Sequence, residues 1–316
     1  MIKRDYVIDH VSALLICWMV FYHILQVSGL YGPNGLSLDP LFFFMPWFFY
    51  KSGMYHRPST LHDAVRKGAS KFLYPFVVYT VIGQVFYLFR LYVTNDLTFR
   101  HAFLSPIGTI LLSGTTSANA PLWFLLSLFL VKVIAVGITR RGIALAVMVA
   151  SLSVGVVFNV VHFEIIPPHY VINSMVGLSF YCAGYLFRQH QFSNSVFIVS
   201  VLVYGASLVF GQSIVDINSN ALLKGHYLLW PLEAVAAIVV INNVFSRYLY
   251  KELLVVSFVG RHSMSILCWH WIIIRTVDAA LRYVCNVCDS IFLSLSMMLI
   301  CIVFFSFQLN RKKCLE

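Results

Sequence analysis

Ten continuous apolar stretches of about 20 residues run through the sequence, and they constrain its fold more than any other feature. Each is long enough for a helix to cross a hydrocarbon core of about 30 Å. They cover about 8–29, 38–55, 71–94, 121–139, 142–162, 168–188, 194–212, 227–246, 260–281 and 289–309. A transmembrane β-barrel would need alternating apolar and polar residues. We therefore expect an all-α polytopic membrane bundle of about ten transmembrane helices.

Composition supports this class. Apolar residues make up 60% of the chain and charged residues only 11%, whereas soluble domains carry about 25% charged residues. No soluble domain, internal repeat or low-complexity tract interrupts the pattern. The segment 103–112 is apolar but too short to span, so we expect it at the interface or dipping back. A single integral membrane domain is predicted over 1–316.

The positions of Lys and Arg predict the topology. Positive charge gathers in cytoplasmic loops, and here alternate connections hold most of it. One set contains Lys3, Arg4, Arg57, Arg66, Lys67, Lys71, Arg140, Arg141, Arg188, Arg247, Lys251, Arg311, Lys312 and Lys313, and the other contains Arg100, Lys224 and Arg282, with Arg90 and Arg275 near span ends. We expect both termini in the cytoplasm. The net charge of +10 is then topological and does not indicate nucleic acid.

The first apolar stretch carries three polar residues on one helical face. Asp9, Ser12 and His23 recur at spacings close to whole turns, and fourteen residues place His23 about 21 Å deeper than Asp9. Ionisable groups at such depth are costly and usually mark function. A neutral imidazole there can accept a proton from a hydroxyl as a general base. A histidine that only packs between helices is an equal alternative.

Other polar residues lie within the later stretches. His270 follows Ser263 by seven residues, so both can face one cavity, although a structural histidine is slightly favoured. Glu233 needs a partner, protonation or a polar substrate. Pro46 in the second stretch predicts a kink, and Lys51 there can extend toward cytoplasmic headgroups.

No phosphate-binding glycine loop occurs in a suitable setting. A phosphate-bearing donor would instead meet the cations of the inner loops, chiefly Arg66, Lys67 and Lys71, with Arg140 and Arg141. Charges that only set topology explain any one of these residues at least as well. Cys285 and Cys288 form a lone pair without a second pair or nearby His, so we expect no metal.

The order and spacing of these pieces resemble the acyltransferase 3 family of bacterial membrane O-acyltransferases, which includes fucose 4-O-acetylase-like enzymes. The resemblance covers nearly the whole chain. It rests on Ile8-Asp9 with His23, Met45-Pro46 with Ser52-Gly53, Arg66 with Lys71 and Tyr74-Pro75, Leu122-Trp123-Phe124, Phe180 to Tyr185, and Gly260 through Ser263 to His270.

The resemblance implies transfer of an acyl group, usually acetyl, from cytoplasmic acyl-CoA to a sugar hydroxyl of a cell-surface or lipid-linked glycan. It places the protein in the bacterial cytoplasmic (inner) membrane, in contact with lipids. His23 would be the base or, as a lesser alternative, a transient acyl carrier. Asp9 would orient or balance charge near the inner mouth, and His270 is a lesser catalytic candidate. Arg66, Lys67, Lys71 and Ser12 would bind the acetyl-CoA donor.

Two positions depart from the family pattern. Ser12 stands eleven residues before His23, where the family usually has Arg or Lys, and Lys51 replaces a residue that is normally apolar. An inactive membrane scaffold is therefore one alternative. A transporter or flippase for a polar or glycan substrate is another, because broken helices and intramembrane polar residues also suit transport. The acceptor sugar, the acyl chain and the oligomeric state stay open.

Overall fold

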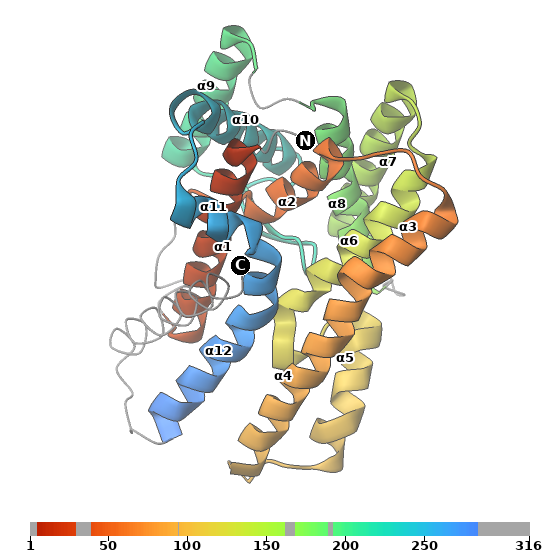
Figure 1. Ribbon diagram of the computed structural model, residues 1–316, viewed down its shortest axis with the longest axis vertical. Helices are drawn as coiled ribbons and strands as arrows, with labels where there is room; N and C mark the ends of the chain where they lie inside the picture. Colours follow the sequence, from red (N-terminus) through yellow and green to blue (C-terminus); the bar gives the residue numbers. More distant parts are fainter. Residues whose placement is uncertain (1–4, 30–38, 94, 162–167, 189–191, 284–316) are drawn as a thin grey trace.

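A computed structural model describes residues 5–29, 39–93, 95–161, 168–188 and 192–283. Helices dominate this part of the chain (Figure 1). In chain order the elements are α1 (Tyr6–Val27), α2 (Phe44–Met54), α3 (Leu61–Gly68), the π-helix η1 (Ala69–Leu73), α4 (Tyr74–Val93), the π-helix η2 (Arg100–Leu104), α5 (Ser105–Ser113), the 3-10 helix η3 (Ser117–Leu122), α6 (Trp123–Ile134), the 3-10 helix η4 (Ala135–Gly137), α7 (Arg141–Val160), α8 (His169–Leu186), α9 (Asn194–Phe210), β1 (Ile214–Asp216), β2 (Ala221–Lys224), α10 (Trp230–Tyr248), α11 (Leu254–Arg261) and α12 (Ser263–Tyr283).

Four helical stretches in the described residues are long and apolar enough to cross a membrane. They are Tyr6–Val27, Leu61–Val93, Arg100–Gly137 and Arg141–Val160, and the apolar helix Asn194–Phe210 is shorter. The class is therefore that of an all-α membrane protein, while ten spans and cytoplasmic termini stay predictions. The expected span at 289–309, the Cys285–Cys288 pair, and Lys3, Arg4 and Arg311 to Lys313 lie outside the described residues.

The second expected span, 38–55, is wrong in extent. Its helix α2 has 11 residues and begins at Phe44, a rise of about 16 Å, which covers only half a hydrocarbon core. Pro46 is the third residue of this helix. The N–H groups of a first turn have no intrahelical partner, so Pro46 removes no hydrogen bond and the expected mid-helix kink does not arise.

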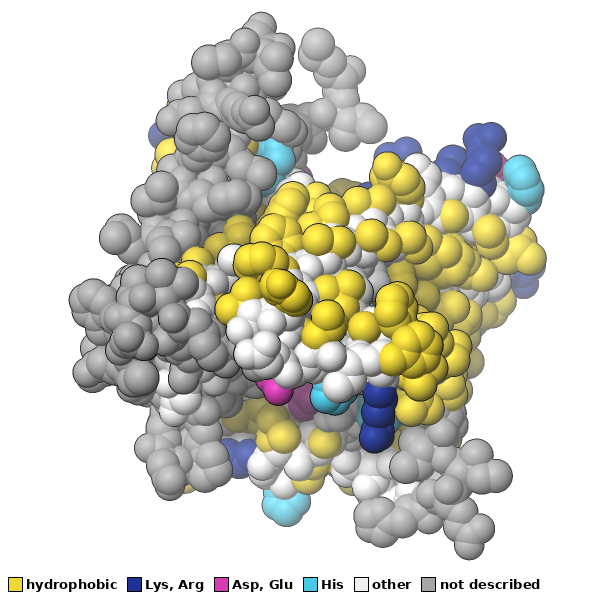
Figure 2. Space-filling view, turned by 90° about the horizontal axis from the view of Figure 1, so that it is seen from below, with side chains coloured by type: hydrophobic (Ala, Val, Ile, Leu, Met, Phe, Trp, Pro, Cys, Tyr) yellow, Lys and Arg dark blue, Asp and Glu magenta, His cyan; other side chains and the backbone are white. Residues whose placement is uncertain are grey.

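Apolar side chains cover the outside of the bundle as well as its inside. On α4, Val81, Val85 and Phe89 recur every four residues and are 57%, 60% and 67% exposed. Viewed from below, the described face is mostly hydrophobic, with a few charged and histidine side chains between apolar areas (Figure 2). In water such a surface would aggregate, so these helix faces suit contact with lipid.

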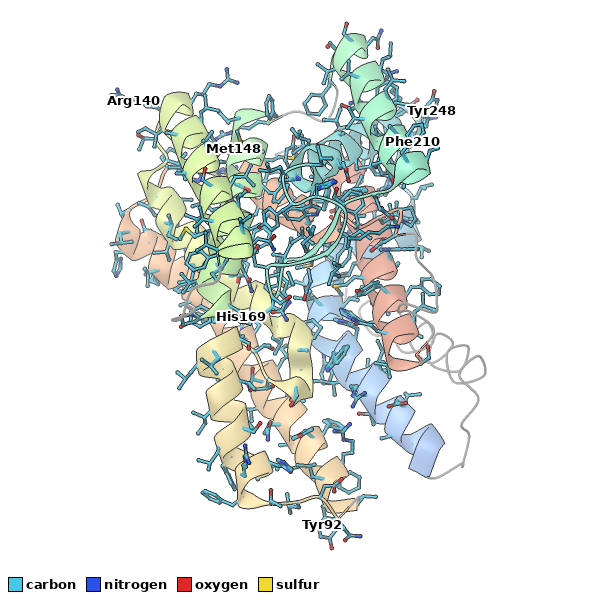
Figure 3. The ribbon with its side chains drawn as sticks, turned by 180° about the vertical axis from the view of Figure 1, so that it is seen from behind. Tyr92, Arg140, Met148, His169, Phe210 and Tyr248 are labelled. Atoms are coloured by element: carbon cyan, nitrogen blue, oxygen red, sulfur yellow. The ribbon has the colours of Figure 1, made fainter. Side chains whose placement is uncertain are left out.

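Connections from the two sets of loops lie at opposite ends of the bundle. Arg140 and Tyr248 lie toward one end and Tyr92 lies at the other (Figure 3). This agrees with the alternation of positive charge in the sequence. The segment 103–112 belongs to η2 and α5, which lie beside α4 (Figure 1), and Gln84 Nε2 of α4 donates a 3.1 Å hydrogen bond to the carbonyl of Ala102.

The helix α1 lies against α2, α10, α11 and α12, and its residues Val11, Leu15 and Ile16 are buried in the core. The approach of α11 is very close, because a Cβ at Gly260 would lie 1.8 Å from the Asp9 carbonyl oxygen. A glycine is required there. The adjoining His10 is a structural histidine, whose Nδ1 donates to the Leu249 carbonyl at 2.9 Å and whose Nε2 accepts from Ser257 Oγ at 3.0 Å.

An antiparallel hairpin of β1 and β2 joins α9 to α10, an element that the all-α prediction did not include. Glu233 holds it in place. Its carboxylate accepts from the Ser213 N–H at 2.7 Å and from the Ser213 hydroxyl at 3.1 Å. Glu233 therefore has a partner within the protein, which was one of its three expected explanations.

Candidate active site

The structure brings two of the predicted site residues together. His23 of α1 and His270 of α12 stack with ring centroids 5.3 Å apart and planes 26° apart. The indole of Trp271 meets His23 edge-on at 5.2 Å. Residues nearly 250 positions apart in the chain thus form one aromatic cluster, because α1 and α12 pack against each other.

Hydrogen bonds fix the proton on each imidazole. His23 Nδ1 lies 3.1 Å from Gln26 Oε1, and His270 Nδ1 lies 3.0 and 2.9 Å from the carbonyl oxygens of Ile266 and Leu267. These oxygens only accept, so each Nδ1 carries the proton. The Nε2 atoms then hold the lone pairs. His270 Nε2 is buried and has no hydrogen-bond partner among the described residues.

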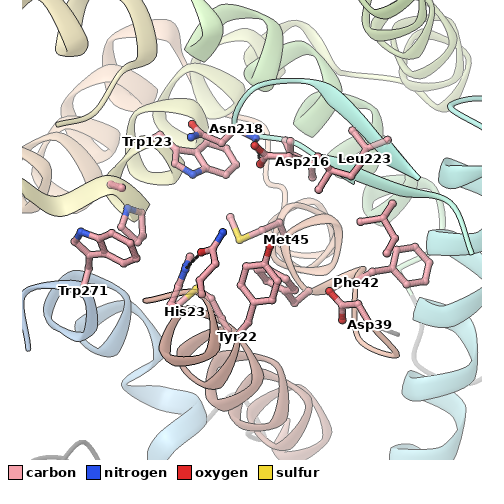
Figure 4. A pocket seen from close by; sticks show the side chains of 18 of the residues that line it. Tyr22, His23, Asp39, Phe42, Met45, Trp123, Asp216, Asn218, Leu223 and Trp271 are labelled. Atoms are coloured by element: carbon pink, nitrogen blue, oxygen red, sulfur yellow. Dashed lines mark hydrogen bonds between the residues drawn. The ribbon is translucent and has the colours of Figure 1, made fainter. Parts of the chain in front are cut away.

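A cavity of about 390 Å³ opens beside His23 (Figure 4). Its size is at the lower end for small-molecule sites, about 300–1,000 Å³. The last turns of α1, the start of α2, the segment η3, the β-hairpin and α12 form its walls. Apolar walls are supplied by Met19, Tyr22, Phe42, Phe44, Met45, Pro121, Trp123, Ile214, Leu223 and Trp271, and polar groups by His23, Gln26, Asp39, Asp216 and Asn218.

Backbone and side-chain donors hold the two carboxylates of this cavity. Asp39 Oδ1 accepts from Trp18 Nε1 at 3.0 Å and from the Leu41 N–H at 3.1 Å. Asp216 accepts from the Asn218 N–H at 3.0 Å and from Ser219 Oγ at 2.7 Å. Asn218 Oδ1 is buried without a hydrogen-bond partner in the described part of the chain. Asn218 thus lines the cavity as a polar residue.

A carboxylate other than Asp9 lies near His23. Fourteen residues of α1, a rise of about 21 Å, separate Asp9 from His23, so Asp9 does not touch the imidazole. Asp216 lies close enough to act electrostatically on His23. Sequence analysis missed Asp39, Asp216 and Asn218. For Asp216 and Asn218 the sequence did hold a signal, because they lie in a polar run, 216–220, between two apolar stretches.

A second polar cluster lies near the other end of α1. The Lys51 ammonium donates a 2.6 Å hydrogen bond to Ser12 Oγ, whose own hydroxyl donates to the Ile8 carbonyl at 2.6 Å. Ser12 is fully buried. Lys51 also lies within electrostatic range of Asp9 and Lys71. The structure thus directs Lys51 toward α1, rather than only toward the headgroups as snorkelling would require.

Further cations surround this inner cluster. Lys71 lies in the π-helix η1, a distortion that is frequent at functional sites. Lys132 lies within electrostatic range of Lys71, and its ammonium donates to the Ser52 carbonyl at 3.1 Å. Arg66 and Lys67 occupy the last turn of α3 with exposed side chains. Lys71 thus lies within electrostatic range of Lys51 and Lys132, which are both half-buried.

A buried hydrogen-bond chain supports the end of α2. The Tyr181 hydroxyl donates to His56 Nδ1 at 2.7 Å, and His56 Nε2 donates to the Ile138 carbonyl at 3.1 Å. Lys132 Nζ donates to the same tyrosine oxygen at 3.4 Å. The chain links the loop after α2 to α6 and α8 and requires a neutral His56.

A family model described as an acyltransferase domain, that of acyltransferase 3, matches residues 5–306. The match spans both the inner cluster and the His23 cavity. Neither the curated proteins nor the solved structures gave a match to the chain.

Proposed function

The chain belongs to the acyltransferase 3 family, and we propose that it transfers an acyl group, in the first place acetyl, from cytoplasmic acyl-CoA to a sugar hydroxyl of a cell-surface or lipid-linked glycan. The setting that we propose is the bacterial inner membrane. The observation that carries this proposal is His23, which lines a cavity with polar groups and stacks on the ring of His270.

The cavity is the acceptor site. A sugar presents several hydroxyl groups on a compact ring, and the polar side chains of Asn218, Asp39 and Asp216 line the pocket between its apolar walls. Such a mixture of apolar walls with a few placed polar groups is typical of small-molecule sites. Trp123 and Trp271 supply flat apolar surfaces on which a sugar ring can pack.

His23 is the general base. Its Nδ1 proton is held by Gln26, so its Nε2 takes the proton of the acceptor hydroxyl as that oxygen attacks the thioester carbonyl. A C–O bond forms, the C–S bond breaks, and the CoA thiolate leaves with the proton that His23 returns. The carboxylate of Asp216 lies close enough to stabilise the transient imidazolium. General-base catalysis contributes roughly 10²–10⁴-fold in rate.

The inner cluster is the donor site. CoA carries phosphates, and Lys51, Lys71 and Lys132, with Arg66 and Lys67 nearby on α3, supply positive charge where a cytoplasmic donor would arrive. Ser12 holds the Lys51 ammonium at this place, and Asp9 balances its charge. Eleven residues of α1, a rise of about 16 Å, separate Ser12 from His23. The acyl end of the donor must cover that depth.

The test is acetylation of glycans by reconstituted membranes that contain the full chain, read by mass spectrometry with acetyl-CoA as donor. His23→Gln keeps polarity but cannot serve as the same base, so we expect at least a 100-fold loss of rate with normal abundance. The matched control is His101→Gln, an exposed histidine of η2. A normal rate for His23→Gln would refute the assignment, and wild-type glycans that never gain an acetyl mass would favour a transporter or flippase.

A further inference from the structure

A second cavity lies further along α12 than the His23 cavity, toward the C-terminal end of the helix. It has a volume of about 350 Å³ and is bounded by α4, η3 and α12. The helices α4 and α12 pack against each other and run side by side (Figure 1). Nothing in the proposed chemistry of His23 uses this cavity.

Its lining combines apolar walls with two guanidinium groups. Arg90 comes from α4 and Arg275 from α12, and no Asp or Glu lines the cavity. Arg90 packs over the Tyr87 ring at 5.1 Å. Arg275 contacts Asp278 at 3.7 Å, which orients its side chain from outside the cavity. The guanidinium group presents a planar fork of donors, so two arginines in one cavity wall are well suited to a phosphate.

The flank of the cavity suits an apolar chain. Phe86, Phe89 and Val93 line it and are 44%, 67% and 51% exposed on the lipid-facing surface of α4. Phosphate-binding arginines beside an apolar, laterally open wall match a lipid that carries a phosphate. A free phosphate would make no contact with this apolar flank, whereas the chain of a phosphate-bearing lipid would.

A thin wall separates this cavity from the one that holds His23. Trp271 lines the His23 cavity and packs against the His23 ring, and its indole N–H donates at 3.4 Å to the carbonyl of Ser117, which lines the second cavity. Arg275 lies one turn beyond Trp271 on α12, about 6 Å along the axis. A group bound by Arg275 is therefore adjacent to the acceptor cavity.

We propose that Arg90 and Arg275 bind the phosphate of a lipid-linked sugar acceptor, whose lipid chain lies along α4 and whose sugar reaches the His23 cavity around Trp271. This inference rests on the proposed function and deepens it, because it selects the lipid-linked form of the acceptor. It makes both arginines binding residues for the lipid phosphate, with no part in proton transfer.

Binding of a polyprenyl monophosphate to the purified full chain in lipid nanodiscs tests the proposal without any catalytic turnover. Arg90→Gln and Arg275→Gln should each weaken its binding about ten- to a hundredfold, the loss that removal of a charged hydrogen-bond partner brings. Arg90→Lys and Arg275→Lys should recover part of the affinity. Arg100→Gln, which removes an exposed arginine of η2 outside the cavity, should bind normally.

Two comparison lipids separate the possible outcomes. Neutral polyprenol should bind at least tenfold more weakly than the monophosphate, and equal binding would overturn the phosphate assignment. Phosphatidylglycerol that binds as tightly as the polyprenyl monophosphate, with the same sensitivity to Arg90→Gln, would make the cavity a site for ordinary membrane lipid and refute the acceptor assignment. Because no acyl transfer is measured, the binding results can be interpreted even if His23 proves not to be the general base.

Discussion

The Lys51 ammonium lies 2.6 Å from the Ser12 hydroxyl oxygen, so a cation from α2 contacts the surface of α1. The Ser12 hydroxyl proton is already committed to the Ile8 carbonyl, so the serine oxygen can only accept from Lys51. Ser12 lacks the charge that the resemblance leads one to expect, and the neighbouring helix places a cation against it.

Loss of the Lys51 charge should weaken the donor interaction. Lys51→Met keeps the aliphatic stem and removes the ammonium, so we expect the acyl-CoA requirement in reconstituted membranes to rise about ten- to a hundredfold, with Lys51→Arg intermediate. Lys251→Met, at an exposed lysine after α10, is the control. An unchanged acyl-CoA requirement would mean that Lys51 serves only to pack α2 against α1.

The inner-loop cations should affect the donor more than the acceptor. We expect Lys71→Gln to raise the acyl-CoA requirement more than Arg66→Gln or Lys67→Gln does, because Lys71 lies within electrostatic range of Lys51 and Lys132. Separate titrations of donor and acceptor distinguish the two effects. If donor dependence stays constant in all three variants, these residues act only on topology.

The hairpin residues should affect the acceptor side. Asn218→Leu keeps the approximate size but removes the buried acceptor oxygen, and we expect the acceptor requirement to rise by about tenfold, the typical cost of one hydrogen bond at about 1–1.5 kcal/mol. Asp216→Asn should instead lower the maximal rate. Lys224→Gln on the same hairpin lies outside the cavity and serves as control. A raised acyl-CoA requirement in Asn218→Leu would place the donor, and not the sugar, in this cavity.

Stability should fall on mild acidification through His56. Burial and the positive charge of Lys132 lower the pKa of His56 below its ordinary value of 6.5. The unfolded chain then binds the proton at higher pH than the folded chain, so stability is lost as pH falls below 6.5 toward the lowered folded pKa. Thermal unfolding midpoints measured across this window should decline for the wild type and decline less for His56→Gln. Equal declines would show that other groups dominate.

Sequence periodicity predicted the long helices well and the short ones poorly. The stretches at 71–94, 142–162 and 168–188 correspond to α4, α7 and α8 within a few residues. The stretch at 38–55 gave only α2, because an apolar run does not reveal where a helix begins. Pro46 marked that beginning, since proline is tolerated in a first helical turn.

The sequence could show which candidate residues share a face of α1, but not which residues of other helices contact them. The spacing within α1 placed Asp9, Ser12 and His23 on one side of a helix, and that side contacts other helices. It could not show that His270 stacks on His23 or that Lys51 reaches Ser12, because these contacts depend on how distant helices pack. Asp216 and Asn218 were missed since they lie in a short hairpin that has no apolar period of its own.

The backbone contact between Gly260 and Asp9 joins α11 to α1, the helix that carries His23, and α11 is followed directly by α12, which carries His270. Gly260 lies ten residues before His270, so a side chain at 260 would act at a distance from both imidazoles. Gly260→Ala would push α11 away from α1 by an ångström or more and shift the His270 ring relative to His23. The geometry of the imidazole stack therefore depends on the absence of one methyl group at the opposite end of the helix pair.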